Sequence, residues 1–159
     1  MTDHDGTVKT GAVIYRSEFV SEIWAEVWPL LKQHWLEVSD NLDIPLEPNI
    51  DLYGVAENQG IFKLFTARID NELVGYAAFM ISNSLHNASA VVAIQDVLYV
   101  KPARRKSRVG YKLIQFCDDQ LREIGVDIVY HHTKVKHDFG RLLERIGYKF
   151  EEKVYFRRL

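Results

Sequence analysis

Two runs rich in β-forming residues, 61–69 and 73–82, are separated by the polar segment Asp70–Asn71–Glu72. This arrangement predicts an antiparallel hairpin, because Asp and Asn favour tight turns between strands. The second run is apolar almost throughout, which is typical of a central strand covered on both faces. The chain is therefore expected to fold around a β-sheet with a covering layer on each side.

Strands and helices alternate in the second half of the chain. Residues 91–100 form a third predicted strand that Lys101–Pro102 stops, and a helix with one apolar face follows from about Val109 to Ile124. A strand over 127–134, a helix over 138–146 and a last strand from about Tyr148 to Arg157 are expected next. Strands joined through helices pair in parallel, whereas the hairpin pairs antiparallel, so the predicted sheet is mixed.

The first third of the chain is predicted to be helical. Apolar residues recur at spacings of three and four from Phe19 to Leu31, with Pro29 expected to kink this helix or to start a second piece. A short helix is expected from Pro48 to about Asn58, and residues 1–12 are expected to be a flexible or edge segment. The predicted fold class is α/β (α+β): one domain, residues 13–159, in which helices flank a central twisted mixed sheet.

Composition excludes several classes of protein. The chain has 159 residues, of which 47% are hydrophobic and 26% charged, which is typical of a single packed domain. The single cysteine allows no internal disulfide, and the start of the chain lacks a secretory signal, so a cytoplasmic monomer or homodimer is expected. The longest apolar stretch, Tyr76–Ile81, is far too short to span a membrane.

The net charge of −2 conceals an uneven distribution along the chain. Residues 1–100 hold 5 Lys/Arg against 14 Asp/Glu, whereas residues 101–159 hold 15 against 8. Such a basic half is typical of proteins that bind a nucleotide, a nucleic acid or a lipid head group.

Much of this positive charge lies where the predicted strand 91–100 ends and the helix at Val109 begins. The N–H groups in the first turn of a helix bind phosphate, and nearby Arg and Lys side chains add charge-assisted hydrogen bonds. The segment therefore predicts a pyrophosphate site, and the alternative is an ordinary solvated basic loop.

Three motifs in this chain resemble the GNAT superfamily of acetyl-CoA-dependent N-acetyltransferases, particularly its small phage-encoded or phage-like members. The family pattern, a strand followed by x-Pro-x-x-Arg/Gln-x-x-Gly-x-Gly/Ala and a helix, is matched by Val100, Pro102, Arg105 and Gly110. Residues 72–79, ELVGYAAF, are similar to the family's central strand, and residues 142–150, LLERIGYKF, to its closing helix and glycine. The resemblance covers about residues 13–158 and implies a GNAT-like fold with acetyl-CoA as co-substrate.

The resemblance also implies which residues hold acetyl-CoA. Main-chain groups from Leu98 to Val100 are expected to pair with the pantetheine arm, and the basic loop and first helical turn to surround the pyrophosphate. The implied residues are Leu98, Tyr99, Val100, Arg105, Lys106, Ser107, Arg108, Val109, Gly110 and Tyr111. Arg108 departs from the family, which usually has a glycine at this position, so its side chain either contacts the phosphates or disturbs binding.

Acetyl transfer to an amine needs an unprotonated nitrogen, and an alkylamine has a pKa of about 10.4. The family often uses a carboxylate on the strand before the phosphate loop as the base, directly or through water, and Asp96 is the matching residue. An aspartate with a pKa of about 3.9 needs burial or a water relay for this role. The alternative is that Asp96 accepts hydrogen bonds in a strand bulge.

The usual general acid of the family, a tyrosine four residues before the closing glycine, falls at Leu143 and is absent. Tyr130, Tyr148 and Tyr155 are candidate substitutes, and the sequence does not select among them. Because a thiol with a pKa of about 8.5 can leave partly as thiolate, slower turnover is expected rather than none.

Histidines form the other group of candidate functional residues. His131 and His132 are adjacent, so on one strand they face opposite sides, and no metal site is expected. One of them is expected near the acetyl group, and His132 is a second candidate base because its pKa of about 6.5 suits that role. Cys117 lies in an apolar stripe and is expected to be buried.

The leading hypothesis is an acyl-CoA N-acyltransferase that acts on a primary amine of a small molecule or a protein. The alternative, suggested by Leu143 and Arg108, is a GNAT-fold module that binds acetyl-CoA without turnover. A nucleic-acid-associated protein is a third possibility and ranks last, because the chain lacks interleaved basic and aromatic residues. The aromatic and acidic segment from Trp28 to Tyr53 is expected to bind a cationic acceptor amine.

Overall fold

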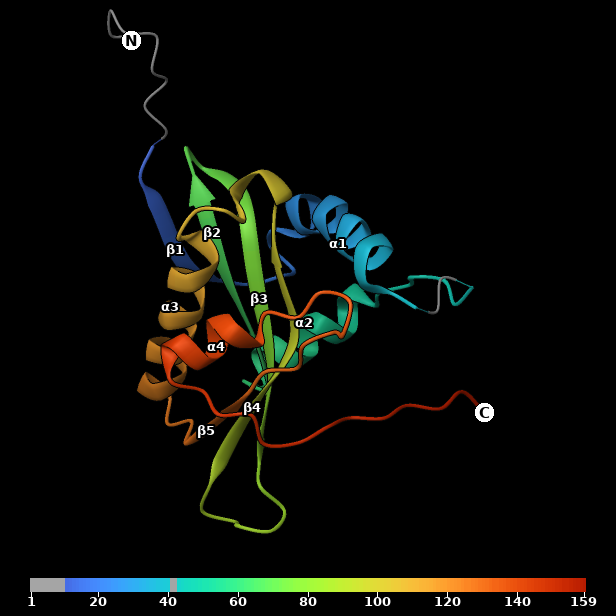
Figure 1. Cartoon of the computed structure of the whole chain (residues 1–159), viewed down its shortest axis with the longest axis vertical. Helices are drawn as coiled ribbons and strands as arrows, with labels where there is room; N and C mark the ends of the chain where they lie inside the picture. Colours follow the sequence, from blue (N-terminus) through green and yellow to red (C-terminus); the bar gives the residue numbers. More distant parts are fainter. Residues whose placement is uncertain (1–10, 41–42) are drawn as a thin grey trace, which may run out of the picture.

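The computed structural model describes residues 11–40 and 43–159 and contains a five-stranded sheet between two helical layers (Figure 1). Helices α1 and α2 cover one face of the sheet, and α3 and α4 cover the other. In chain order the elements are β1 (Val13–Glu18), α1 (Trp24–Val38), α2 (Ile50–Asn58), β2 (Phe62–Ile69), β3 (Glu72–Asn83), β4 (Val91–Val100), a 3₁₀ turn (Pro102–Arg104), α3 (Val109–Glu123), β5 (Ile128–Tyr130) and α4 (Gly140–Ile146). This arrangement confirms the predicted single-domain α+β class.

The strands lie in the order β1-β2-β3-β4-β5, antiparallel from β1 to β4 and parallel between β4 and β5. The predicted hairpin is confirmed: Asp70 and Asn71 have φ values of 50° and 67°, the left-handed region that a tight turn between twisted strands requires. Strand β3 is the central strand, as its apolar composition predicts.

Two apolar cores lie on either side of the sheet. Leu113, Cys117 and Leu121 of α3 pack against residues such as Phe65 and Phe79, which confirms the predicted burial of Cys117. Val27 and Leu30 of α1 pack on the opposite face against Leu64, Tyr76 and Tyr99. Among the described residues, no helix is long and apolar enough to cross a membrane.

Several predictions about the ends of elements are wrong. Residues 13–18 form strand β1, which the mixed sequence VIYRSE does not indicate. Helix α1 starts at Trp24 rather than near Phe19, and it continues through Pro29. Of the predicted 1–12 segment, residues 1–10 lie outside the described part of the chain.

The C-terminal part of the sheet is also smaller than predicted. Strand β5 covers only Ile128–Tyr130 instead of 127–134, because the chain beyond Tyr130 turns away from β4. The predicted last strand, Tyr148 to Arg157, is not formed, since this segment finds no neighbouring strand within the described chain.

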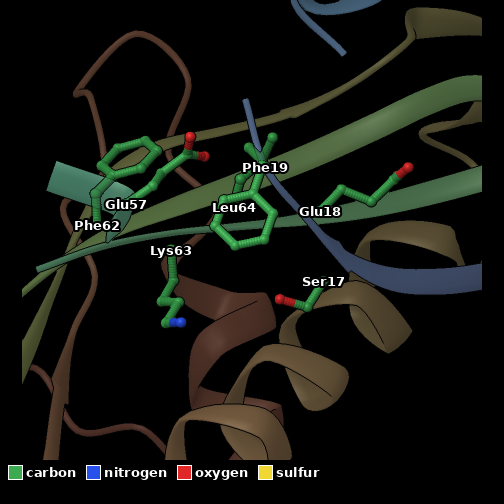
Figure 2. Close-up of a pocket in the computed structure, with 7 residues that line it drawn as sticks. All are labelled: Ser17, Glu18, Phe19, Glu57, Phe62, Lys63 and Leu64. Atoms are coloured by element: carbon green, nitrogen blue, oxygen red, sulfur yellow. The ribbon is translucent and has the colours of Figure 1, made fainter. Parts of the chain in front are cut away.

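Glu57 explains why α1 begins late. Its buried carboxylate accepts hydrogen bonds from the Val20 N–H and from the Ser21 hydroxyl (3.0 Å), which holds residues 19–22 in a turn. Figure 2 shows Glu57 beside Phe62, with Lys63 directed away from it. The cavity at this place measures about 20 Å³, room for one water, so it is not a substrate site.

Arg68 joins β1, β2, α1 and the hairpin turn. Its guanidinium donates to both carboxylate oxygens of Glu18 (2.9 and 3.2 Å), to both of Glu26 (2.7 and 2.9 Å) and to the Asn71 carbonyl (2.8 Å). These five bonds use all five N–H groups of the side chain, which is 4% exposed. The hydrogen bonds to Glu26 and Glu18 raise the pKa of Arg68, so the charge stays fixed in the core.

Replacing Arg68 with methionine should lower the free energy of unfolding by about 3 kcal/mol, because the Glu18 side chain, which is 16% exposed, is left without its cation. The matched control is Arg122→Met, which removes an exposed ion pair with Asp119 and should cost at most about 0.5 kcal/mol. Urea unfolding measures both changes, and equal losses in the two variants would contradict the structural role of Arg68.

Candidate functional site

Strands β4 and β5 separate half-way along β4. They pair only from Val92 to Ile94, and β4 continues to Val100 with β3 alone beside it among the described residues. Because the Lys101 N–H donates to Val74 of β3 (2.9 Å), strand alternation turns the main-chain groups of Leu98 and Val100 toward the open edge. This edge offers hydrogen-bonding groups to a ligand that runs along β4.

Asp96 is the extra residue of a β-bulge at the same point. Ala78 of β3 lies opposite Val97 and Phe79 lies opposite Gln95, so Asp96 has no partner in the register. Burial raises the pKa of Tyr53 and of Tyr76, and the negative charge of Asp96 adds to both shifts, so Asp96 lies on the α1–α2 side of the sheet with these two rings. The predicted bulge is therefore present, and the carboxylate has no hydrogen-bond partner within the described chain.

The side chain of Asp96 is solvent-accessible, yet the protein around it displaces enough water that burial raises the pKa of its carboxyl group. A raised pKa makes an aspartate a stronger proton acceptor than it is in water. The bulge thus places a carboxylate suited to act as a base where β4 leaves β5.

The basic loop leads into α3 as predicted. The N-cap residue of α3, Arg108, makes no side-chain capping bond. The N–H groups of Gly110 and Tyr111 have no acceptor within the helix. Lys106, Ser107 and Arg108 are exposed, and the Arg108 guanidinium lies 5.7 Å from the centre of the Tyr111 ring.

Gly110 is not required by the fold. A Cβ atom added there would meet the Val100 side chain at 3.7 Å, an ordinary contact, and the backbone is not in the left-handed region. The lack of a side chain at this glycine and the uncapped N–H groups together fit an approaching phosphate.

Arg105 has a different environment from the rest of the loop. Its Nε donates to the Val100 carbonyl (2.8 Å), and its two terminal nitrogens donate to the carboxylate of Glu37 on α1 (2.6 and 2.7 Å). These bonds lower the pKa of Glu37. Arg105 also lies over the ring of Tyr99, so it fixes the end of α1 to the end of β4.

A cluster of three rings, those of His34, Tyr76 and Tyr99, fills the space between α1 and the sheet. His34 lies 5.1 Å from Tyr99 and 6.4 Å from Tyr76, measured between ring centroids. Desolvation lowers the pKa of His34 to about 4, so the imidazole is neutral at pH 7. The Tyr76 hydroxyl is fully buried and finds no hydrogen-bond partner in the described chain.

The two adjacent histidines differ in exposure, although the predicted strand that would separate them ends before them, at Tyr130. His131 points inward, where its Nδ1 is 2.7 Å from the Gln95 Oε1 and its ring contacts Tyr148, whereas His132 is exposed. Burial lowers the pKa of His131 to about 4. In residues 11–40 and 43–159, no group of three His, Cys, Asp or Glu residues is arranged to hold a metal ion.

The structure places the three candidate acids differently, with Tyr130 half-buried at the end of β5. Leu143 is buried in α4, as its place in the apolar stripe predicts. The Tyr148 hydroxyl donates to Asp118, and Tyr155 is almost fully exposed.

Comparison with known proteins agrees with this geometry. The model of the acetyltransferase (GNAT) family matches residues 19–148. The chain belongs to the GNAT family.

Several solved GNAT-like structures resemble this chain in fold. An aminoglycoside acetyltransferase from an uncultured soil metagenomic sample superimposes with a TM-score of 0.71 at 18% identity, over 93% of this chain and 95% of that one. Ribosomal-protein-alanine N-acetyltransferase from Brucella melitensis biovar Abortus 2308 gives 0.72 at 19%, over 93% and 99%. A predicted acetyltransferase with acetyl-CoA from Clostridium acetobutylicum gives 0.68 at 12%, over 92% and 96%.

A curated relative is similar over a shorter stretch. Aminoalkylphosphonate N-acetyltransferase of Salmonella typhimurium strain LT2 is 30% identical over 81 residues. These residues are 50% of this chain and 52% of the relative, so the match spans about half the length of each protein.

Some residues of the GNAT site escape prediction from sequence. Glu37 and His34 come from α1, far from the phosphate loop in sequence, and only the folded chain brings them to Arg105 and Tyr99. A weak signal exists, because Leu30, His34 and Glu37 follow helical spacing and so place polar residues on the inward face of α1.

The neutral His34 should make stability depend on pH. The unfolded histidine takes up a proton near pH 6.5 and the folded one only near pH 4, so stability is complete above pH 6.5 and is lost as the pH falls toward 4. We expect His34→Phe to reduce the loss of unfolding free energy between pH 7 and pH 5 by about 1–2 kcal/mol.

Denaturant unfolding at the two pH values measures this effect, and His86→Phe, at an exposed loop position, is the matched control that should leave the loss unchanged. Burial lowers the pKa of His131 to about 4 as well, so this residue keeps its own share of the loss in His34→Phe. A loss as large as that of the wild type would contradict the assignment.

Proposed function

We propose that this chain transfers the acetyl group of acetyl-CoA to a primary amine. The observation that carries the proposal is the separation of β4 from β5 with the bulged Asp96 at its start. Family membership supports the reaction class, since the matched relatives include N-acetyltransferases of small molecules and of a protein. The finer resemblance to small phage-encoded members stays a prediction.

The residues along β4 and at the start of α3 would hold acetyl-CoA. The main-chain groups of Leu98 and the Val100 N–H suit the amides of the pantetheine arm, while the Val100 carbonyl already accepts a hydrogen bond from Arg105. The first turn of α3 suits the pyrophosphate. Lys106, Ser107, Arg108, Val109, Gly110 and Tyr111 lie at that turn. When bound, acetyl-CoA supplies the activated thioester.

Two of the predicted cofactor residues serve the site in another way. The main chain of Tyr99 pairs with β3 and its side chain faces α1, while Arg105 binds Glu37. We propose that both shape the edge of the cofactor site and that their neighbours make the contacts with acetyl-CoA.

Asp96 would accept the proton that the amine must lose. Its raised pKa and its unpaired carboxylate suit this role, and its bulged position faces the α1–α2 side of the sheet, away from α3. His132 is the second candidate base proposed from the sequence, and it is exposed beyond β5. With Leu143 in place of an acid, the thiol would leave as thiolate, which its pKa of about 8.5 permits at reduced rate.

The acceptor would bind beside Tyr53 and Asp96. The rings of Trp24 and Tyr53 lie 6.4 Å apart at this place, and aromatic rings beside a carboxylate favour a cationic amine. Trp28 and Trp35, also in the predicted acceptor segment, line an apolar groove of about 260 Å³ between α1 and residues 44–46, and the Trp28 ring stacks on Trp24 at 5.4 Å.

The second candidate function is acetyl-CoA binding without turnover, and buried Leu143 is the observation that favours it. Release of free thiol in the presence of a panel of amines separates the two functions. Release with any acceptor establishes an enzyme, whereas binding without release across the panel supports the binding module.

Acetyl-CoA at 100 times its dissociation constant should stabilise the chain by about 2.7 kcal/mol. Gly110→Leu should remove most of this stabilisation, because the new side chain fills the space proposed for phosphate. Gly54→Leu is the matched control, since a Cβ at Gly54 of α2 meets nothing within 4 Å. Thermal unfolding with and without acetyl-CoA measures both, and equal ligand stabilisation of the two variants would contradict the proposed phosphate site.

Asp96→Asn should lower kcat/KM for the amine at pH 7 by about 10²- to 10⁴-fold while leaving acetyl-CoA binding unchanged, because the amide cannot accept the proton. Asp119→Asn, on the exposed side of α3, is the control that should keep full activity. A comparable loss in His132→Gln, with Asp96→Asn active, would instead identify the histidine as the base.

A further inference from the structure

An apolar groove lies along one side of α1, next to the place proposed for the acceptor amine. It measures about 260 Å³ and separates α1 from residues 44–46, which Figure 1 shows beyond the end of this helix. Its apolar walls are Trp28, Trp35 and Leu36 of α1, faced by Ile44, Pro45 and Leu46, and Lys32 adds a charge to the lining. We call it the α1 groove.

Helical spacing in α1 explains the position of this groove. Trp24, Trp28 and Trp35 are four and seven residues apart, so their side chains lie along one side of the helix. Val27 and Leu30 point into the core from the neighbouring side. The stretch of α1 from Trp28 to Leu36 spans about 12 Å, which is the length available to a ligand in the groove.

A stack of rings joins the α1 groove to the proposed acceptor position. Tyr53 lies on the same side of the sheet as Asp96, and its ring is 6.4 Å from that of Trp24. The Trp24 ring stacks on Trp28 at 5.4 Å, and Trp28 is a wall of the groove. A substrate whose amine lies at Asp96 therefore has a continuous apolar path for the rest of its body.

The size of the exposed apolar surface favours a small ligand over a protein partner. Leu36 and Ile44 are 70% and 44% exposed, whereas Asp40 and Asp43 beside them are charged and form ion pairs with basic residues. A stable protein interface buries about 800 Å² on each partner, more than this bounded surface offers. The groove volume is instead near the lower end of the range for small-molecule sites, about 300–1,000 Å³.

Lys32 restricts what the far end of such a ligand can carry. Its ammonium lies 5.1 Å from the centre of the Trp28 ring, which brings a positive charge to the groove. Asp96 attracts an amine at one end of the path, and Lys32 repels a second cationic group at the other. The groove therefore suits an apolar body and opposes a polyamine.

We propose that the acceptor is a primary monoamine with an alkyl or aryl body, which lies in the α1 groove while its amine lies at Asp96. The position of the amine rests on the acetyl transfer proposed above, whereas binding of the apolar body does not. A fully buried methylene group favours binding about fourfold. Because contacts with remote parts of a substrate add to kcat/KM, the preference among amines should rise with chain length until the groove is full.

The kinetic test compares unbranched alkylamines of increasing length as acceptors, with thiol release as the readout. From ethylamine to octylamine, kcat/KM should rise about two- to fourfold per methylene, because one side of the chain faces solvent in an open groove. The terminal diamine with the same chain as octylamine should lose most of this gain, since its second ammonium meets Lys32. Equal kcat/KM for ethylamine and octylamine would overturn the proposal.

A pair of leucine variants locates the preference in the groove. Leu36→Asn puts an amide into the groove wall and should lower the octylamine-to-ethylamine ratio of kcat/KM by about fivefold. Leu85→Asn is the matched control, because this leucine is 98% exposed in the loop between β3 and β4 and lies outside the groove, so the ratio should stay as in the wild type. Circular dichroism checks that both variants are folded, and a ratio that changes equally in both would contradict the groove.

A binding measurement separates this inference from the proposed reaction. All three tryptophans of the chain lie in the ring stack or the groove, so octylamine added without acetyl-CoA should change their fluorescence to a saturating level. Ethylamine at the same concentration should not, and Leu36→Asn should raise the Kd for octylamine by about fivefold.

The two readouts fail in different ways. Saturable octylamine binding without thiol release would support the groove and contradict the proposed transfer. Thiol release from ethylamine and octylamine alike, with unchanged tryptophan fluorescence, would contradict the groove and leave the transfer standing.

Discussion

The short parallel pairing between β4 and β5 determines the rest of the site. Three residues of β4 pair with β5, and the following residues have only β3 as a neighbour. Buried main-chain groups normally find partners, so an open strand edge between two helical layers is a place for a ligand that supplies the missing hydrogen bonds. The basic loop follows directly from the end of this strand, which brings main-chain groups, basic side chains and the uncapped start of α3 into one line.

The open edge would be poorly defined without support from α1. Arg105 provides that support by binding the Val100 carbonyl and the Glu37 carboxylate together. The loop after β5 is tied to the same end of α1, through His137 to the Glu37 carbonyl (3.0 Å) and through Lys136 to Asp40. The last two turns of α1 therefore hold both sides of the gap between β4 and β5.

The sequence predicts those helices, strands and turns that a local sequence pattern identifies without help from tertiary contacts. The apolar run of β3, the turn at Asp70 and the amphipathic α3 each carry enough local information, and Lys101–Pro102 marks where β4 ends and the basic loop begins. Strand β1 escapes prediction because half of its residues are polar, and its place depends on pairing with β2. The predicted strand after Tyr148 has the right residues and lacks a partner strand within the described chain, which no local pattern reveals. The same holds for Glu37 and His34, whose roles arise only from tertiary contacts.

The bulge at Asp96 also controls which way the end of β4 faces. Gln95 points toward His131 on the α3 side, and the extra residue reverses the alternation, so that Val97 and Tyr99 face α1 while Leu98 and Val100 face α3. Deleting one residue at the bulge would turn Val97 and Tyr99 toward α3 and would turn Leu98 and Val100 toward α1. Tyr99 would then no longer contact His34. In related chains the number of residues between Gln95 and the phosphate loop should therefore be kept more strictly than their identity, and an alignment gap at this point would mark a protein with a different acceptor side.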